Sequence, residues 1–595
     1  MIGELSRAER SRRMLLLRAF LDRAEALGPA TSGHPTASVT EAWDLLVRTQ
    51  RVSPEVVEAV LMAPGAGTWV SSALRRLRDR DESLAPLWAV TGHLASLAAT
   101  AATRAGVDFS LSVPAHRGFV PLPGVGCAVL PAGGDWAGAR ISLDGGDLRI
   151  AGEGNEVRVG TDFARPSPGW LPARRLVLTR SGSAPELLLD EHGPYRTFAG
   201  PSVPRILSDS EALAWESALA DAWSILGQDE PTTAGAMGPG LASLAPAAPR
   251  ERFRPYSSSA GEAFGGVNAS LPDSGAQLAA TLVHEFQHIK LGALTHLEPL
   301  LHPLKPASEE ELFYAPWRDD PRPLEGLLQG IYAFFGVARF WRAHMRRAEG
   351  GQTALARFEF ALWREKVWSA LRAVQHQERL TLVGGRLLEI LAAKCAQWLD
   401  EEVSDCELRI ARQAIADHRA RWREHHLRPS SKAVSEAVRA WRRGDDSPPA
   451  AMSEAADLVP DRHAAYLDTA AVLARHRLTA PEGDWTAPAR GAVRGAWEAD
   501  ILLARGERAS AARTLLHDAR AGNLRTGTWS SLGLALAGDP AMASASRLLI
   551  HHPERARSVY EAWREEDGER PDPVSLAGWL GGADSRDDDG WVLRG

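Results

Sequence analysis

Near the middle of the 595-residue chain lies the segment Ser274-Gly-Ala-Gln-Leu-Ala-Ala-Thr-Leu-Val-His284-Glu285-Phe286-Gln287-His288-Ile-Lys-Leu-Gly-Ala-Leu294. Asp273 or Ser274 can cap the start of a helix, because a short polar side chain accepts a hydrogen bond from the first free backbone N–H groups. Apolar residues recur along the segment at helical spacing: Leu278, Leu282, Val283, Phe286 and Ile289. The segment therefore predicts a helix with one buried face.

His284 and His288 are four residues apart, so their imidazoles project from the same side of this helix. That spacing predicts a shared metal ion, with Glu285 beside it in the position of the general base of metallopeptidases. The alternative is that both histidines are structural. It is less favoured, because a chain of this composition contains His-Glu-x-x-His by chance in roughly one case in thirty.

A metal ion needs at least one further protein ligand. A second helix is predicted to start near Leu324, with Glu325 and Gln329 one turn apart on the same face. A carboxylate is the usual partner of two histidines in zinc peptidases and in non-haem iron sites, so Glu325 is the predicted third ligand and Gln329 the possible substitute. Each can equally be an exposed polar residue of a helix. His296 and His302 are weaker candidates because their spacing is less regular.

Three stretches resemble one known family. They are Glu262-Ala-Phe-Gly-Gly-Val-Asn-Ala-Ser-Leu-Pro272, the histidine helix itself, and Tyr314-Ala-Pro-Trp-Arg-Asp-Asp-Pro-Arg-Pro-Leu-Glu-Gly-Leu-Leu-Gln-Gly330. The family is the HExxH-motif peptide-modification family, encoded beside ribosomally made peptide natural products (RiPP biosynthesis) in actinobacteria. The resemblance is specific over about residues 208–345.

This resemblance implies an oxidoreductase, a dioxygenase that uses iron(II) and 2-oxoglutarate to hydroxylate side-chain β-carbons of a precursor peptide. It implies His284 and His288 as metal ligands and leaves the third ligand open between Glu325 and Gln329. Dioxygen and the precursor peptide are the implied partners. Two histidines and one carboxylate leave three positions of an octahedral iron site for the 2-oxoacid and dioxygen. In such a cycle Glu285 has no required base role.

The distal carboxylate of 2-oxoglutarate calls for a fixed guanidinium, which binds a carboxylate through two parallel hydrogen bonds. Arg318 and Arg322, just before the predicted third-ligand helix, are the best candidates. Tyr314 or one of Ser257–Ser259 is expected to add a hydrogen bond. The alternative for each arginine is a structural ion pair with Asp319, Asp320 or a helix end.

Two other functions remain open. The first is a zinc metallopeptidase with Glu285 as general base and Glu325 as third ligand. It is favoured by the bare motif and by the strand-like run 263–270, which can pair with a substrate peptide. The second is a non-catalytic scaffold in a peptide-maturation complex.

The composition of the chain limits which partners, which cysteine chemistry and which cellular compartment are expected. Sixty-eight basic and 75 acidic residues give a net charge of -7, which supplies no electrostatic reason to expect nucleic acid or an anionic membrane as partner. Three cysteines without a CxxC pair exclude a disulfide framework. No stretch of 18 or more apolar residues occurs, and the N-terminus lacks a signal-peptide pattern, so a cytoplasmic protein is expected.

The expected fold is mainly α with a smaller β-rich section (α+β), with a zincin-like HExxH helix in a helical catalytic core. The predicted regions are an N-terminal helical and β-rich region (1–205), a catalytic metal-binding domain (206–430) and a C-terminal helical domain (431–595). Within them, a hairpin is predicted around Gly145-Gly146. A loop is predicted from Gln228 to about Pro255, and a hinge from Lys432 to Asp457.

Overall fold

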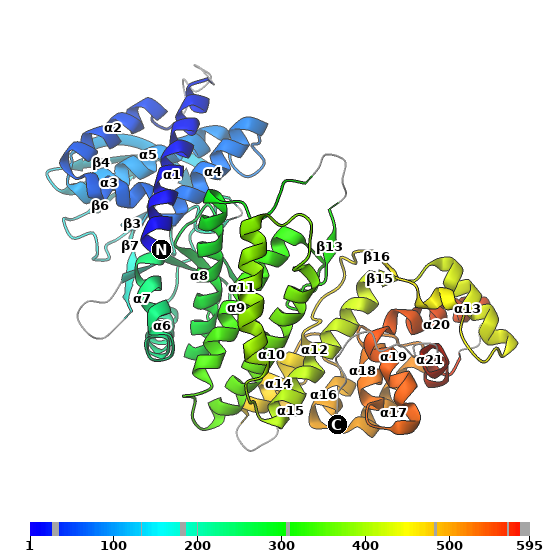
Figure 1. Ribbon diagram of the computed structural model, residues 1–595. Helices are drawn as coiled ribbons and strands as arrows, with labels where there is room; N and C mark the ends of the chain where they lie inside the picture. Colours follow the sequence, from blue (N-terminus) through cyan, green and yellow to red (C-terminus); the bar gives the residue numbers. More distant parts are fainter. Residues whose placement is uncertain are drawn as a thin grey trace. The chain divides into compact units, whose positions relative to one another are not determined.

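The computed structural model describes residues 1–26, 35–132, 134–178, 186–198, 200–304, 310–480, 485–567 and 571–582. The chain forms two compact units (Figure 1). The first unit contains Met1–Arg250 and Pro255–Pro299, and the second contains Glu251–Arg254 and Leu300–Gly595. The division near residue 300 falls inside the predicted region 206–430, so that region is shared by both units. The predicted boundaries at 205/206 and 430/431 stay predictions.

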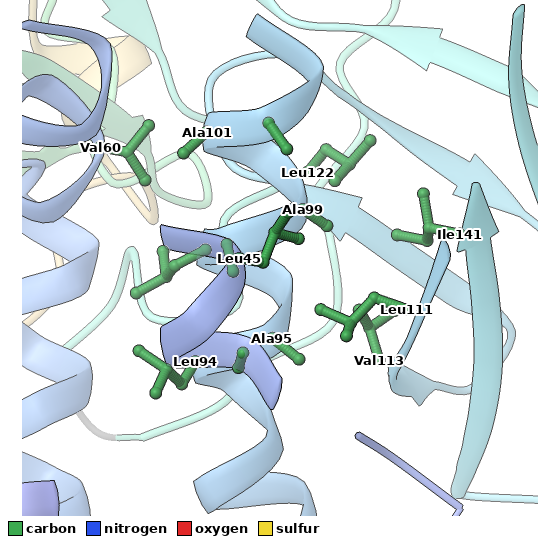
Figure 2. Packing of buried hydrophobic residues seen from close by; sticks show 14 of the residues in the cluster. Leu45, Val60, Leu94, Ala95, Ala99, Ala101, Leu111, Val113, Leu122 and Ile141 are labelled. Atoms are coloured by element: carbon green, nitrogen blue, oxygen red, sulfur yellow. The ribbon is translucent and has the colours of Figure 1, made fainter. Parts of the chain in front are cut away.

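Five helices open the first unit, within the stretch 1–205 that the sequence predicts to be helical and β-rich. They are α1 (Ile2–Ala26), α2 (Val39–Val52), α3 (Pro54–Leu61), α4 (Pro64–Asp79) and α5 (Leu87–Ala105). Helix α5 is buried at almost every position, and its many alanines let neighbouring elements approach closely. In Figure 2, α5 presents Leu94, Ala95, Ala99 and Ala101 to the hydrophobic core formed with α2, α3 and the first strands.

The first sheet follows these helices and is antiparallel throughout, in the order β6-β5-β4-β1-β2-β3-β7. Its outer strands β6 and β7 contact each other, so the sheet nearly closes. The predicted hairpin is confirmed and joins β4 to β5. Gly145 and Gly146 both have positive φ (57° and 94°), as a two-residue turn between two antiparallel strands requires. The strands are β1 (Phe109–His116), β2 (Phe119–Leu122), β3 (Gly126–Val129), β4 (Trp136–Asp144), β5 (Asp147–Gly152), β6 (Asn155–Val159) and β7 (Trp170–Pro172).

A second, mixed sheet of the first unit has the order β11-β12-β10-β9-β8. Its centre, β10, is parallel to β9 and β12 and is buried at all four positions. Helices α6 and α1 pack against α8, which also contacts β11 (Figure 1). The elements are β8 (Arg174–Val177), β9 (Glu186–Leu189), α6 (Asp209–Asp229), α7 (Pro231–Gly240), β10 (Ser243–Pro246), β11 (Ser257–Ser258), β12 (Gly266–Ala269) and α8 (Gly275–Leu297).

The loop predicted from Gln228 to Pro255 is wrong over much of its length, because it contains α7 and β10. Pro231 starts α7 at a position where a missing N–H costs nothing. Strand β10 lies between two parallel neighbours, and such strands are recognised poorly from sequence because both faces are buried.

The second unit is almost entirely helical, as predicted from Leu324 onward. The hinge predicted from Lys432 to Asp457 is wrong in its first half: α13 buries Ala433, Val434, Ala437 and Val438 on one face. The helices are α9 (Leu324–His344), α10 (Gly351–Val374), α11 (Leu382–Leu399), α12 (Asp405–His426), α13 (Ser431–Arg443), α14 (Thr469–Thr479), α15 (Thr486–Ala489), α16 (Glu498–Arg505), α17 (Arg508–Ala521), α18 (Thr528–Leu536), α19 (Ala543–His551), α20 (Pro553–Asp567) and α21 (Pro573–Gly581). Short strands pair as β13 (Leu312–Phe313) with β14 (Arg322–Pro323), and β15 (Leu427–Arg428) with β16 (Asp457–Leu458).

Helices and antiparallel sheet together make this an α+β protein, as the sequence predicts. Within the described ranges, no helix is both long enough and apolar enough to cross a membrane.

Replacing Leu94, a fully buried residue of the α5 core, by alanine is expected to lower the free energy of unfolding by about 2–5 kcal/mol through lost contacts and the cavity left behind. Urea unfolding followed by circular dichroism measures the change. The control is Leu84→Ala, whose side chain is exposed and whose effect should stay within about 0.5 kcal/mol. Equal effects of both substitutions would contradict this description of the core.

Candidate metal centre

Helix α8 carries the histidine motif and starts as predicted. The Ser274 hydroxyl accepts a 3.2 Å hydrogen bond from the Gln277 N–H, and the Gln277 side chain in turn accepts from the Asp273 N–H. Between Thr281 and Ile289 every residue is buried except His284 and His288, which are partly exposed. The helix therefore offers these two side chains at its accessible surface.

The two imidazoles face each other through the same ring atom. His284 Nε2 and His288 Nε2 lie 3.1 Å apart, with ring planes at 77°. Two ligands of one metal ion at about 2.0–2.1 Å, separated by an angle of about 90–109°, lie about 2.9–3.4 Å apart. The observed separation thus fits two adjacent positions of one coordination sphere. A direct N–H···N hydrogen bond between two neutral imidazoles fits the same distance.

His284 is held in the protonation state that binds metal. Burial, and then the charge of His288, lower its pKa well below the ordinary value. A neutral imidazole has a free lone pair, so no proton must be removed before coordination near neutral pH.

Glu285 lies beside the histidines, and its side chain is fixed rather than free to swing. Its Oε2 accepts a 2.6 Å hydrogen bond from the Ser259 hydroxyl, while Oε1 lies 3.9 Å from His284 Nε2. Burial raises the pKa of Glu285, opposed by the charge of His288 and by hydrogen bonds from Ser257 and Ser259. The carboxylate is therefore a buried neighbour of the imidazoles with one oxygen already engaged.

The predicted third ligands belong to the second unit. Glu325 is exposed in the first turn of α9, and Gln329 follows one turn later, partly buried. A carboxylate in a first turn is also favoured by the helix dipole, which is the structural alternative. Over the described residues, no group of three or more His, Cys, Asp or Glu side chains is arranged to hold a metal ion. The role of Glu325 or Gln329 as ligand remains a prediction.

The competing histidines are placed differently. His296, three turns along α8 from His284, lies with its Nδ1 2.6 Å from the Glu9 carboxylate of α1. His302 is exposed and lies in the second unit. An ion-pair or hydrogen-bond role accounts for His296 without a metal.

Both arginines predicted to bind 2-oxoglutarate contact one carboxylate. Arg318 Nε donates to Asp320 Oδ1 at 2.8 Å, and Arg322 Nη1 donates to Asp320 Oδ2 at 3.1 Å. Burial opposes ionisation of Asp320, but these two guanidiniums outweigh it and its pKa is lowered. These contacts are the structural ion pair that the sequence offers as the alternative to cosubstrate binding. The cosubstrate role of both arginines stays a prediction.

Tyr314, the predicted cosubstrate hydrogen-bond donor, is engaged elsewhere in the second unit. Its hydroxyl lies 2.9 Å from His418 Nδ1, and its ring packs against Trp422 at 5.0 Å between centroids. Burial raises the pKa of Tyr314, so the phenol stays protonated and can donate this bond.

Sequence reasoning missed the bond between Ser259 and Glu285. The sequence predicts these serines only as hydrogen-bond donors to the cosubstrate, whereas Ser259 donates to the motif glutamate from 26 residues away. No local pattern signals such a contact, because β11 and α8 are separated along the chain and meet only in the folded unit. In comparisons with protein-family models and with curated proteins, none matches this chain.

Replacing Ser259 by alanine is expected to destabilise the protein by about 1–3 kcal/mol, because the buried Glu285 carboxylate loses a hydrogen bond without regaining water. Urea unfolding measures the loss. In the control Ser258→Ala, the hydroxyl removed contacts only the exposed Tyr256 hydroxyl, and the change should be small. A Ser259→Ala protein as stable as wild type would mean that this bond contributes nothing.

Proposed function

We propose that this protein is an iron(II)- and 2-oxoglutarate-dependent hydroxylase acting on side-chain β-carbons of a ribosomally synthesised precursor peptide. The observation that carries the proposal is the 3.1 Å separation of two partly exposed imidazole nitrogens on a helix with the sequence His-Glu-Phe-Gln-His. The resemblance of residues 208–345 to the HExxH-motif peptide-modification family selects oxygenase chemistry among the reactions that such a pair supports.

In the proposed site, different residues bind the iron and the cosubstrate. His284 and His288 hold the iron, and Glu325 or Gln329 completes the ligand set. Bound iron(II) supplies dioxygen activation coupled to oxidative decarboxylation of 2-oxoglutarate. Arg318 and Arg322 are the proposed partners of the distal carboxylate. Each uses one N–H group on Asp320, and a guanidinium has five donors, so both retain groups for a second carboxylate.

Glu285 is proposed as a positioning residue rather than a base. Its hydrogen bond to Ser259 holds the carboxylate next to His284, where it can orient the imidazole or a nearby water. The same proximity is the observation that favours the runner-up, a zinc metallopeptidase in which Glu285 takes a proton from water. The two candidate functions differ in what they require of this carboxylate.

Anaerobic addition of iron(II) and then 2-oxoglutarate to the purified chain is expected to produce a weak visible charge-transfer band, because a 2-oxoacid chelates iron bound by the histidines. His288→Ala should abolish the band by removing a ligand. His302→Ala, which removes an exposed histidine, is the matched control and should leave the band unchanged.

Tight zinc binding with no band in the wild type would contradict the hydroxylase and favour the peptidase. Unchanged peptide maturation in cells carrying His284→Ala would instead indicate a non-catalytic scaffold.

The Glu285→Gln variant keeps the shape and the bond from Ser259 but removes the base. For a hydroxylase we expect hydroxylation within about tenfold of wild type, because loss of an orienting group costs far less than loss of an essential base. For a peptidase we expect a loss of about 100-fold or more. Mass spectrometry of treated peptides separates the outcomes, since hydroxylation adds one oxygen whereas hydrolysis divides the chain.

A further inference from the structure

The first unit contains a cavity of about 690 Å³, and the residues of the histidine motif do not belong to its lining. Its walls come from α1, α3, α5, the end of α7 and the strands β8, β9 and β10. Ligand-binding cavities commonly have volumes of about 300–1,000 Å³. This one is large enough for several amino-acid side chains.

Two buried polar side chains line the cavity without a hydrogen-bond partner among the described residues. His93 and Tyr195 are each 4% exposed, and their rings lie 4.8 Å apart between centroids. Burial lowers the pKa of His93 to about 3, so its ring is neutral and offers one donor and one acceptor. Both side chains line the cavity, so their polar atoms are available to water or to a ligand that enters it.

The wall beside them is rigid because Arg13 ties three segments together. Its Nη1 donates to the carbonyls of Leu61 and Ala63, and its Nη2 donates to the Glu262 carbonyl at 2.9 Å. Gly67 permits this approach, since a Cβ there would lie 2.2 Å from Arg13 Nη2. The cavity is therefore preformed.

The rim carries cations whose charge is not balanced locally. Arg104 and Arg175 both line the cavity and are exposed, and neither has a carboxylate partner in the described part of the chain. Arg175 donates only to the Gly124 carbonyl. Burial, followed by the charge of Arg175, lowers the pKa of Arg104, which reflects how close the two guanidiniums are.

The acidic residues of the lining are engaged elsewhere. Glu58 forms an ion pair with Arg10 at 2.9 Å, and Glu9 is bound to His296. Glu55 accepts from the Ser53 hydroxyl, and Asp190 accepts from the Gly193 N–H. The lining as a whole carries five arginines against these four acidic side chains, which is a small excess of positive charge.

We propose that this cavity binds an acidic segment of a peptide, with Arg104 and Arg175 holding its carboxylates and with His93 and Tyr195 hydrogen-bonding to the part inserted between the walls. Clustered arginines are a recurrent means of recognising acidic peptide motifs. That the peptide is the precursor modified by this protein rests on the proposed function. The inference that the cavity binds an acidic peptide does not depend on the proposed function.

A peptide fits these features better than a small anion. The lining extends from α1 across α5 to the second sheet, and the arginines lie at the rim while the neutral polar groups are buried. His93 and Arg104 are 11 residues apart on α5, which corresponds to about 16 Å along a helix. A small carboxylate can therefore reach only one of these sets, whereas an extended chain can reach both.

Fluorescence anisotropy of full-length protein, without iron or 2-oxoglutarate, tests the inference. The probe is a fluorescein-labelled octapeptide of alternating glutamate and leucine, compared with the same peptide carrying lysine for glutamate. We expect the acidic probe to bind at least about tenfold more tightly, with affinity falling as salt is added. The double variant Arg104→Glu/Arg175→Glu should weaken it by about tenfold or more. Tyr195→Phe should weaken it about fivefold by removing one hydrogen bond.

The matched control is Arg140→Glu/Arg149→Glu, which reverses two exposed charges on the first sheet outside the cavity. It should bind the acidic probe as wild type does. Equal binding of both probes, or a cavity variant indistinguishable from the control, would overturn the proposal. Displacement of the probe by millimolar glutamate would show a small-anion site and overturn it as well. If the probe binds as expected while the iron titration fails, the hydroxylase proposal falls and this inference stands.

Discussion

The candidate site depends on how the carboxyl group of Glu285 is buried on the motif helix. The side chain is 1% exposed, and the Ser259 hydroxyl donates a 2.6 Å hydrogen bond to it beside that from Ser257. A carboxylate taken out of water without such compensation costs several kcal/mol. Rotation of α8 about its axis would break this bond, and would also carry His284 and His288 away from the accessible surface. The bond therefore adds to the packing of the apolar residues of α8 against α6 and α1, which sets the side of the helix that presents the imidazoles.

Two physical effects together make the histidines suitable for metal binding. The helical repeat places the two imidazoles on one face, where their side-chain conformations bring the Nε2 atoms to 3.1 Å. Burial then holds His284 in its neutral form. Neither effect selects the metal, because zinc and iron(II) both accept two imidazoles in adjacent positions. The proposal of iron and 2-oxoglutarate rests on the resemblance of the surrounding segments to the HExxH-motif peptide-modification family. The role of Glu285 distinguishes that chemistry from hydrolysis, because only hydrolysis requires it as a general base.

Helix α1 connects the two features of the first unit to which we assign function. Glu9 contacts His296 on the motif helix, and Arg13, one turn further, lines the cavity and anchors its wall. A peptide held in the cavity would therefore be bound by the same framework that supports the imidazoles. Helix α1 also contributes Leu17, Phe20 and Ala24 to the core around α5, so α1 contributes to the stability of this unit as well.

The sequence by itself determined the elements whose signals are local. These include the Ser274-capped helix, the four-residue spacing of His284 and His288, the Gly145-Gly146 hairpin and the α+β class. Such features depend on residues a few positions apart, where periodicity and turn chemistry suffice. The tertiary structure decided the partners of buried polar groups: Ser259 for Glu285, Asp320 for both predicted cosubstrate arginines, and the cavity lined by His93 and Tyr195. These contacts form only after segments distant in the sequence pack together, so no local sequence pattern predicts them. Burial then makes it costly to leave any of these polar groups without a hydrogen-bond partner.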